Sequence, residues 1–452
     1  MIRSTALASC ALLVSILVPA LARSGVDDYR LDRILVLTER GGRVSWSPDG
    51  QWIAYDRRED DDLYDVHIIR PDGTDQHCLT CEHPQLPGFN VGQPEWHPGG
   101  RFLVIEVEMA EHGGSHEGSR PGSGIYNNLW VLDLEDGFVD PPATQLTDVR
   151  DGRPLGEAEG GVLHSAFNHD GSRLLWTDME DYQLALIVGD WQLAIADFVT
   201  DPAPALVHTQ FYNPGPKPEW FEAHGWGPPG EDWVYFACTP LAGMHMWNAD
   251  ICRMDLDRPE QVTRLTFSAG VDGEPSIYDE HAKMSPLHDA ITWASDAVVD
   301  RNRMELFMAN LDGSGARRVT SFNEAGHAHA TGHQTQTWDH SWNPAPAEGW
   351  QELAVIVVYT DEDPPRETIR ILHFEVGEGI APESDPYAQA PRESCGCRAA
   401  GPQRGGPLAE IWPGLILLLH AGRRRRFRRT AASPATLDKN AFHWTGSSEY
   451  GG

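Results

Sequence analysis

The sequence predicts an all-β fold, a six-bladed β-propeller closed by a strand from the start of the mature chain. Three observations favour this fold. A short motif, an aromatic residue or Met followed by a turn, recurs along the chain, and each copy precedes apolar segments of strand length. The last unit also lacks a closing apolar strand, and a segment of that composition precedes the first copy of the motif. Regular self-similarity at this period is typical of propellers.

The repeated motif is clearest in Trp46-Ser47-Pro48-Asp49-Gly50. Pro presets φ for a tight turn, and Asp-Gly supplies the next residue and its left-handed partner. Successive markers are separated by 50, 71, 59, 58 and 58 residues. The markers are Trp46, Trp96, Phe167, Trp226, Met284 and Trp342.

Each marker precedes an apolar segment, and a second alternating segment follows, as in Asn128–Leu134. Most units end on Leu-Thr or Val-Thr, for example Leu79-Thr80. Each unit therefore supplies about four short strands, as a propeller blade requires. The first apolar segments are Trp52–Tyr55, Phe102–Val107, Leu174–Thr177, Trp233–Ala237, Ala290–Ala294 and Leu353–Tyr359.

The sixth unit lacks a closing strand after Phe374. Arg33–Thr38 ("RILVLT") has the same apolar-then-Thr ending and precedes the first marker. We expect it to pair with Ile369–Phe374, so that the first and last units share one sheet. Such closure removes the exposed strand edge of an open array.

The residues Trp46-Ser47-Pro48-Asp49-Gly50 and Leu306–Thr320 ("LFMANLDGSGARRVT") resemble the TolB-type, WD40-like propeller repeats of exported bacterial proteins. The resemblance covers about residues 33–375. It implies the propeller fold and a surface on the ring that binds a protein or another ligand.

Both ends of the chain have the composition of targeting segments. Arg3, an apolar stretch through Val18, and Ala20-Leu21-Ala22 are typical of a signal peptide. We expect a signal peptide in residues 1–22, the propeller in 23–380, a linker with Cys395-Gly396-Cys397 in 381–410, a hydrophobic segment plus arginine cluster in 411–429, and a disordered tail in 430–452.

The Cys-Gly-Cys motif, the hydrophobic segment and the arginine cluster resemble a bacterial C-terminal sorting tag of the MYXO-CTERM type. This resemblance implies processing that leaves the protein at the cell surface. One departure is that 23 residues follow Arg429. The alternative is a plain C-terminal membrane anchor. We expect export through the inner membrane to the periplasm or cell surface.

The formal net charge of −32 predicts a strongly acidic surface. Nucleic acid and anionic lipid are poor partners for such a surface, because binding phosphates requires clustered Lys and Arg. We expect no nucleic-acid partner. We expect a monomer that contacts a membrane only through its C-terminal segment.

The cysteines outside the end segments are Cys78, Cys81, Cys238 and Cys252. Disulfides are the better interpretation in an exported protein. We expect a local Cys78–Cys81 loop and a Cys238–Cys252 bridge between neighbouring strands of blade 4. A zinc site at "HCLTCEH" is the alternative, although the second pair lacks a matching spacing.

Several histidines precede the blade markers by similar offsets, so the ring should bring them to the central channel. His164 and His281 lie three residues before their markers, and His224 and His340 lie two residues before theirs. A one-residue shift turns a side chain to the opposite face, so only one of these pairs points inward unless bulges intervene. The alternative is that these histidines hydrogen-bond to backbone. Arg43, Gln93 and Asp339 share the offset of three, and Glu222 lies close to it.

Imidazoles with a nearby oxygen form a candidate divalent-metal site. We name Arg43, Gln93, His164 and His224 as ligand-binding candidates. A second resemblance, to oligogalacturonate lyases, implies that His281, His340 and Gln336 or Gln93 hold a divalent ion. That ion would acidify a uronate C5 proton, with Arg43 or Lys283 assisting.

The leading hypothesis is a non-catalytic, surface-displayed propeller that binds a protein or a glycan. The alternative is a metal-dependent polysaccharide lyase with a His-rich channel. No Gly-x-Ser-x-Gly elbow, P-loop or dinucleotide fingerprint is present in the sequence.

Overall fold

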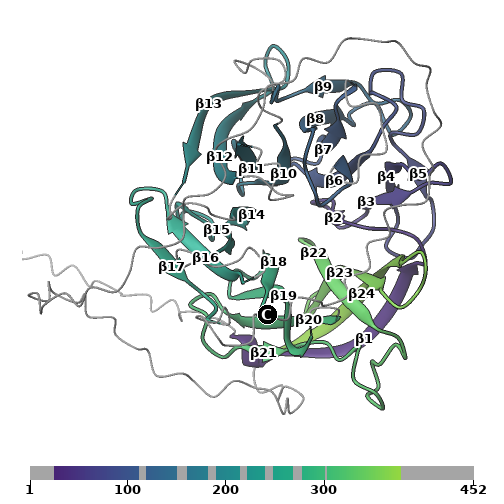
Figure 1. Cartoon of the computed structure of the whole chain (residues 1–452), viewed down its shortest axis with the longest axis vertical. Coiled ribbons are helices and arrows are strands. Elements are labelled where there is room, and N and C mark those ends of the chain that lie inside the picture. The colour runs from purple at the N-terminus through teal and green to yellow at the C-terminus, as the bar shows by residue number, and fades with distance from the viewer. Residues whose placement is uncertain are drawn as a thin grey trace, which may run out of the picture. The chain divides into compact units, whose positions relative to one another are not determined.

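The protein is described by a computed structural model, covering residues 25–110, 119–149, 160–181, 190–213, 221–239, 248–267, 277–300 and 303–377. Over these ranges the fold is all-β, with one short 3-10 helix, η1 (Val26–Asp28). Six four-stranded antiparallel sheets surround a common axis, as Figure 1 shows. The predicted six-bladed propeller is confirmed.

In each blade the strands follow one another outward from the axis (Figure 1). Blade 1 contains β2 (Val44–Trp46), β3 (Ile53–Arg58), β4 (Tyr64–Ile69) and β5 (His77–Cys78). Blade 2 contains β6 (Val91–Trp96), β7 (Phe102–Glu108), β8 (Asn127–Asp133) and β9 (Ala143–Gln145). Blade 3 contains β10 (Val162–Phe167), β11 (Arg173–Asp181), β12 (Asp190–Val199) and β13 (Ala205–Tyr212). Blade 4 contains β14 (Phe221–Trp226), β15 (Trp233–Cys238), β16 (Asp250–Asp255) and β17 (Val262–Arg264). Blade 5 contains β18 (Asp279–Met284), β19 (Ala290–Asp300), β20 (Arg303–Asn310) and β21 (Arg317–Arg318). Blade 6 contains β22 (Thr335–Trp342), β23 (Trp350–Tyr359), β24 (Arg366–Val376) and β1 (Tyr29–Thr38).

The tight turn of the repeated motif is held by its own side chains. In blade 1, the Ser47 carbonyl accepts a hydrogen bond from the Gly50 N–H at 2.9 Å. Ser47 Oγ accepts another from the Trp52 N–H at 2.9 Å. Gly50 has a φ of 66°, which favours glycine at this position. The Ser-Pro-Asp-Gly sequence therefore sets the turn between β2 and β3 locally.

The Leu-Thr or Val-Thr ending also has a structural reason. In blade 5, Thr320 Oγ1 accepts the N–H of Leu306 at 2.9 Å and donates to Glu305 Oε2 at 2.6 Å. The equivalent hydroxyls accept a third-strand N–H at 2.9 to 3.0 Å in three further blades, where they belong to Thr80, Thr147 and Thr266. The Thr thus attaches the outer edge of a blade to its third strand.

Ring closure follows the predicted pairing. Strand β1 runs antiparallel to β24, with Arg33 opposite His373 and Thr38 opposite Ile369. The start of β1 is also tied to blade 5, since Tyr29 Oη donates to Asp289 Oδ1 at 2.8 Å. The prediction that Arg33–Thr38 completes the last blade is confirmed.

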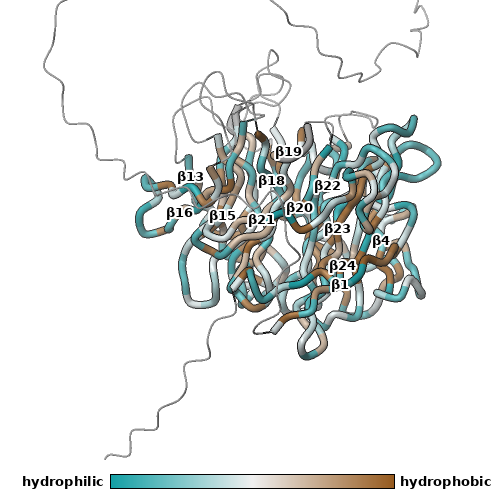
Figure 2. Tube along the Cα trace, turned by 90° about the horizontal axis from the view of Figure 1, so that it is seen from below, coloured by the Kyte–Doolittle hydropathy of each residue, from teal (hydrophilic) through white to brown (hydrophobic). Residues whose placement is uncertain are grey.

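The core consists of apolar layers between neighbouring blades. Val44 and Trp46 of blade 1 pack in one cluster with Ala354 and Ile369 of blade 6. Figure 2 shows the hydrophobic segments along the strands and the hydrophilic ones mainly at the connections. Blade-to-blade packing of this kind fixes the innermost strands relative to one another.

Both predicted disulfides are present. Cys78 is joined to Cys81, and Cys238 on β15 is joined to Cys252 on the neighbouring β16. Because these sulfurs are bonded in pairs, the zinc alternative at "HCLTCEH" is not supported.

Long connections leave one face of the ring, which we call the long-connection face. In an antiparallel blade, the link between the second and third strands and the link to the next blade both lie where the innermost strand begins. The link from β7 to β8 spans residues 109–126, and that from β21 to β22 spans 319–334. By contrast, the β2–β3 turn on the other face spans only 47–52. Long connections on a rigid scaffold are where binding residues concentrate.

The predicted signal peptide and all segments from residue 381 onward lie outside the described residues. Among the residues that the structure describes, no helix has the length and apolar character needed to cross a membrane.

Candidate functional site in the central channel

Bulges in the innermost strands decide which side chains reach the channel. The pairing register shifts between Gly92 and Glu95 in β6, and equivalent shifts occur in β10, β14, β18 and β22. Gln93, His164 and His281 adopt left-handed φ values of 50°, 45° and 54°. As a result, His164, His224 and His281 come together despite their unequal offsets, with ring centroids 5.2 to 5.8 Å apart.

Side chains of the neighbouring blade hold these bulges by accepting their N–H groups. Asp56 Oδ2 accepts the N–H of Gln93 at 3.1 Å, and Glu106 Oε1 accepts that of His164 at 2.8 Å. His224 Nε2 accepts the N–H of His281 at 3.1 Å. These bonds stabilise a backbone conformation that residues other than glycine seldom adopt.

Carboxylates surround two of the three imidazoles. His164 Nε2 lies 2.5 Å from Glu222 Oε1, and His164 Nδ1 lies 3.4 Å from Asp339 Oδ1. His281 Nε2 lies 3.2 Å from Glu280 Oε2, and His281 Nδ1 lies 3.3 Å from the same Asp339 oxygen. The side chains of all five residues are buried. We call these five residues the channel cluster.

Burial and mutual charge give the two histidines opposite behaviour. Burial lowers the pKa of His164 to about 3. Burial also opposes protonation of His281, but the carboxylates of Asp339 and Glu280 outweigh it and raise the pKa of His281 to about 9. His281 in turn holds the pKa of Asp339 well below its usual range, against the effect of burial. Burial and the neighbouring Glu280 raise the pKa of Glu222 well above normal.

Arg43 and Gln93 lie beside the channel cluster. Arg43 Nε is 3.6 Å from Asp339 Oδ2. With its amide oriented to satisfy both donors, Gln93 accepts from Arg43 Nε at 3.3 Å and from the Gly122 N–H at 3.1 Å. A Cβ at Gly122 would lie 2.2 Å from the Arg43 guanidinium, so the segment at Gly122 covers this arginine closely.

His340 does not join the channel cluster as the lyase resemblance implied. His340 Nε2 lies 2.9 Å from Thr292 Oγ1, and its Nδ1 lies 3.1 Å from the Trp338 carbonyl oxygen. Both ring nitrogens are therefore in hydrogen bonds, which matches the alternative of a structural histidine. Gln336 lies on the other side of the β22 bulge, which falls between Thr337 and His340. Among the described His, Cys, Asp and Glu residues, the groups that could hold a metal ion include His281 but not His340.

Three residues important to this site were not recognised as such from the sequence. Asp56, Glu106 and Glu280 are buried carboxylates, the first two within the second strands of their blades and Glu280 on an innermost strand. The available signal was an acidic residue inside an otherwise apolar segment, as in Phe102–Glu108. Such a residue must find a partner when it is buried.

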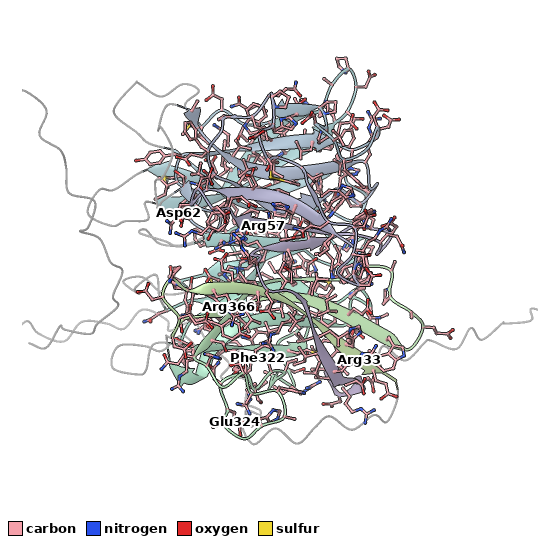
Figure 3. The ribbon with its side chains drawn as sticks, turned by 90° about the vertical axis from the view of Figure 1, so that its right-hand side faces the viewer. Arg33, Arg57, Asp62, Phe322, Glu324 and Arg366 are labelled. Carbon is pink, nitrogen blue, oxygen red and sulfur yellow. A yellow bond between two sulfur atoms is a disulfide. The ribbon has the colours of Figure 1, made fainter. Side chains whose placement is uncertain are left out.

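A second feature is a cleft on the long-connection face where blade 6 meets blade 1. Its volume is about 710 Å³. Figure 3 labels three of its lining residues, Arg57 and Asp62 on blade 1 and Arg366 on blade 6. We call it the seam cleft. Its lining includes five arginines, which are Arg40, Arg57, Arg58, Arg120 and Arg366.

The seam cleft is charged rather than apolar. Its arginines pair with acidic neighbours, for example Arg57 with Glu59 at 2.7 Å and Arg366 with Glu362 at 2.8 Å. The rim is open to solvent, since the side chain of Arg40 is 55% exposed and that of Asp60 is 99% exposed. These groups are therefore available to a charged partner, whereas the channel cluster lies below the surface.

No protein-family model matches the chain, and no curated protein matches it. Solved structures similar to it include an Agrobacterium tumefaciens protein assigned as TolB, with 15% identity over 64% of this chain and 87% of that chain and a TM-score of 0.42. TolB from Acinetobacter baumannii shares 16% identity over 77% of this chain and 68% of its own, with a TM-score of 0.39. A prolyl endopeptidase structure shares 13% identity over 73% of this chain but only 42% of its own length, with a TM-score of 0.42.

Proposed function

We propose that this protein is an exported β-propeller that serves as a binding module for a protein ligand, with the seam cleft as the contact site. The observation that carries the proposal is the gathering of five arginines in this cleft, in a chain of net charge −32. Arginine is enriched at protein interfaces, where its planar group pairs with carboxylates.

The cleft favours a protein over a glycan. Its lining contains one aromatic side chain, Tyr64, and two prolines, Pro364 and Pro365. Tyr64 is itself buried and donates to Glu367 at 3.2 Å. Apart from Gly41, the remaining lining consists of the five arginines and six acidic side chains, which suits a partner segment that carries both acidic and basic residues. Charge complementarity of this kind steers association and selects partners.

The channel cluster favours binding over polysaccharide cleavage. A lyase would need its metal and base open to a polymer, whereas His164, His281 and Asp339 are each only about 5% exposed. His340, one of the metal ligands that the lyase resemblance implied, also uses both of its ring nitrogens in hydrogen bonds. We therefore do not retain the lyase alternative.

Export and surface display remain part of the proposal. The leader-like residues 1–22, the two disulfides and the sorting-tag resemblance of residues 411–429 support it. Cell fractionation with an antibody against the propeller tests this part separately. Recovery in the cytoplasmic fraction would contradict it.

Charge reversal in the seam cleft tests the binding site. We expect Arg40→Glu and Arg366→Glu to abolish retention of a specific partner from envelope and culture-supernatant proteins by the immobilised protein. Arg258→Glu is the matched control, because Arg258 follows β16 on the opposite face and is 57% exposed. Retention should also weaken as salt rises. A partner that binds wild type and both cleft variants equally would refute the seam cleft as the binding site. Capture of an oligosaccharide instead of a protein would show that the ligand is a glycan.

A further inference from the structure

His164 and His281 share an arrangement within the channel cluster. Each has its Nε2 beside a glutamate, His164 at Glu222 and His281 at Glu280. Each directs its Nδ1 toward one oxygen of Asp339, at 3.4 Å and 3.3 Å. Two imidazoles from blades 3 and 5 therefore converge on a carboxylate from blade 6.

This arrangement is the one that metal-binding histidines show in proteins. A ligating imidazole usually donates its second N–H to a carboxylate, which fixes the ring and its tautomer. Ligands about 2.1 Å from a tetrahedral ion lie about 3.4 Å from one another. The two Nδ1–Oδ1 separations match that spacing, and His164, His281 and Asp339 each offer a ligand atom within 4.8 Å of those of the other two.

Two atoms of this group are in ion pairs but make no hydrogen bond. His281 Nδ1 and Asp339 Oδ2 are buried and lack a hydrogen-bond partner of acceptable geometry. Of the other histidines near the channel, His340 uses both ring nitrogens in hydrogen bonds, and His224 accepts the N–H of His281 through Nε2. Leaving buried polar atoms unsatisfied is costly unless a ligand completes them.

We propose that His164 Nδ1, His281 Nδ1 and Asp339 Oδ1 bind one divalent first-row transition-metal ion, which joins blades 3, 5 and 6 at the channel axis. Two imidazoles and a carboxylate suit Zn²⁺, Mn²⁺ or Fe²⁺ better than Ca²⁺, which prefers oxygen ligands. The burial of the site indicates a structural ion. This inference is independent of the ligand proposed for the seam cleft.

Metal analysis of the purified full chain tests the proposal. After removal of metal with a chelator and reloading with Zn²⁺, we expect about one equivalent per chain by mass spectrometry of the elements. The variants His281→Gln and Asp339→Asn should each lose it. The matched control is His340→Gln, which removes a buried histidine beside the site and should retain the ion. Glu280→Gln keeps the ligands and should weaken affinity by about 10- to 100-fold.

A measurement on the unaltered protein avoids dependence on variants that fail to fold. Saturating Zn²⁺ should raise the midpoint of thermal unfolding by roughly 5 °C, and a chelator should reverse the shift. A wild-type protein that binds neither Zn²⁺, Mn²⁺ nor Fe²⁺ at micromolar concentration would overturn the proposal and leave a simple ion pair between protonated His281 and Asp339. Equal metal loss in His340→Gln and in the ligand variants would also overturn it.

Discussion

Asp56 shows how one buried side chain can join two blades. It lies on β3, and its two oxygens accept the N–H groups of Arg43 in blade 1 and Gln93 in blade 2, each at 3.1 Å. Burial raises the pKa of Asp56 to about 7 and outweighs the opposing effect of the Arg43 charge. The contact that holds the first bulge is therefore sensitive to pH.

The sign of this dependence follows from proton binding. Between about pH 4 and pH 7 the folded protein keeps a proton on Asp56 that the unfolded chain has lost, so stability falls as pH rises through this window. The contribution is at most about 1.4 kcal/mol per pH unit. We expect Asp56→Asn to remove this slope, as measured by urea unfolding from pH 5 to pH 8.

The exposed Asp72 provides the control for this prediction. Its hydrogen bonds with Thr74 lower its pKa, so it stays ionised in both states over the same pH range. Asp72→Asn should leave the slope of wild type unchanged. If Asp56→Asn also left it unchanged, Asp56 would be ionised in the folded protein at pH 5.

The Thr that ends most repeats stabilises its blade through two hydrogen bonds. Thr320 is fully buried, and its hydroxyl is the partner of both the Leu306 N–H and the Glu305 carboxylate. Val has nearly the same shape but leaves both groups without that partner. We expect Thr320→Val to lower the free energy of unfolding by about 1–3 kcal/mol, measured by chemical denaturation.

An exposed threonine separates this effect from β-propensity. The Thr74 hydroxyl donates to Asp72 at the surface, in the turn between β4 and β5. Thr74→Val should change stability by no more than about 0.5 kcal/mol. Equal effects of the two substitutions would mean that the recurrent Thr is not a structural element of the blade.

The bulges explain why the strand pattern alone could not identify the channel residues. In an unbroken strand, His164 and the adjacent Ser165 would face opposite sides, so residues at offsets of three and two from the marker could not both reach the channel. A bulge adds a residue and redirects the side chains that follow. His224 and His164 therefore meet, whereas His340, which shares the offset of His224, turns to Thr292.

The ring as a whole depends on β1, which is distant in sequence from the strand that it completes. Ile34 on β1 packs against the core that contains Leu353 and Phe374, while its neighbour Leu35 is 49% exposed. We expect Ile34→Asp to cost about 2–4 kcal/mol, because it places a charge against apolar side chains. Loss of β1 would also expose the edge of β24, so soluble aggregates should form.

Leu35→Asp is the matched control on the same strand. Because Leu35 faces solvent, this variant should unfold within about 1 kcal/mol of wild type and elute as a monomer in size-exclusion chromatography. If Ile34→Asp behaved in the same way, closure by β1 would contribute little to the stability of the propeller.

The sequence by itself determined the number of blades, the turn in each of them, the closing strand and the two disulfides. These features depend on short-range chemistry, such as Ser47-Pro48-Asp49-Gly50, repeated often enough to reveal its period. They also depend on the one segment, Arg33–Thr38, whose pattern completed the last unit.

Only the tertiary structure decided which of the channel candidates meet. His164, Glu222, His281 and Asp339 come from four different blades, and their contacts depend on bulges that the pattern of apolar residues does not reveal. The physical reason is that a one-residue change in register reverses the side of a strand that a residue faces. The partners of a buried charge are then set by the packing of blades far apart in the sequence.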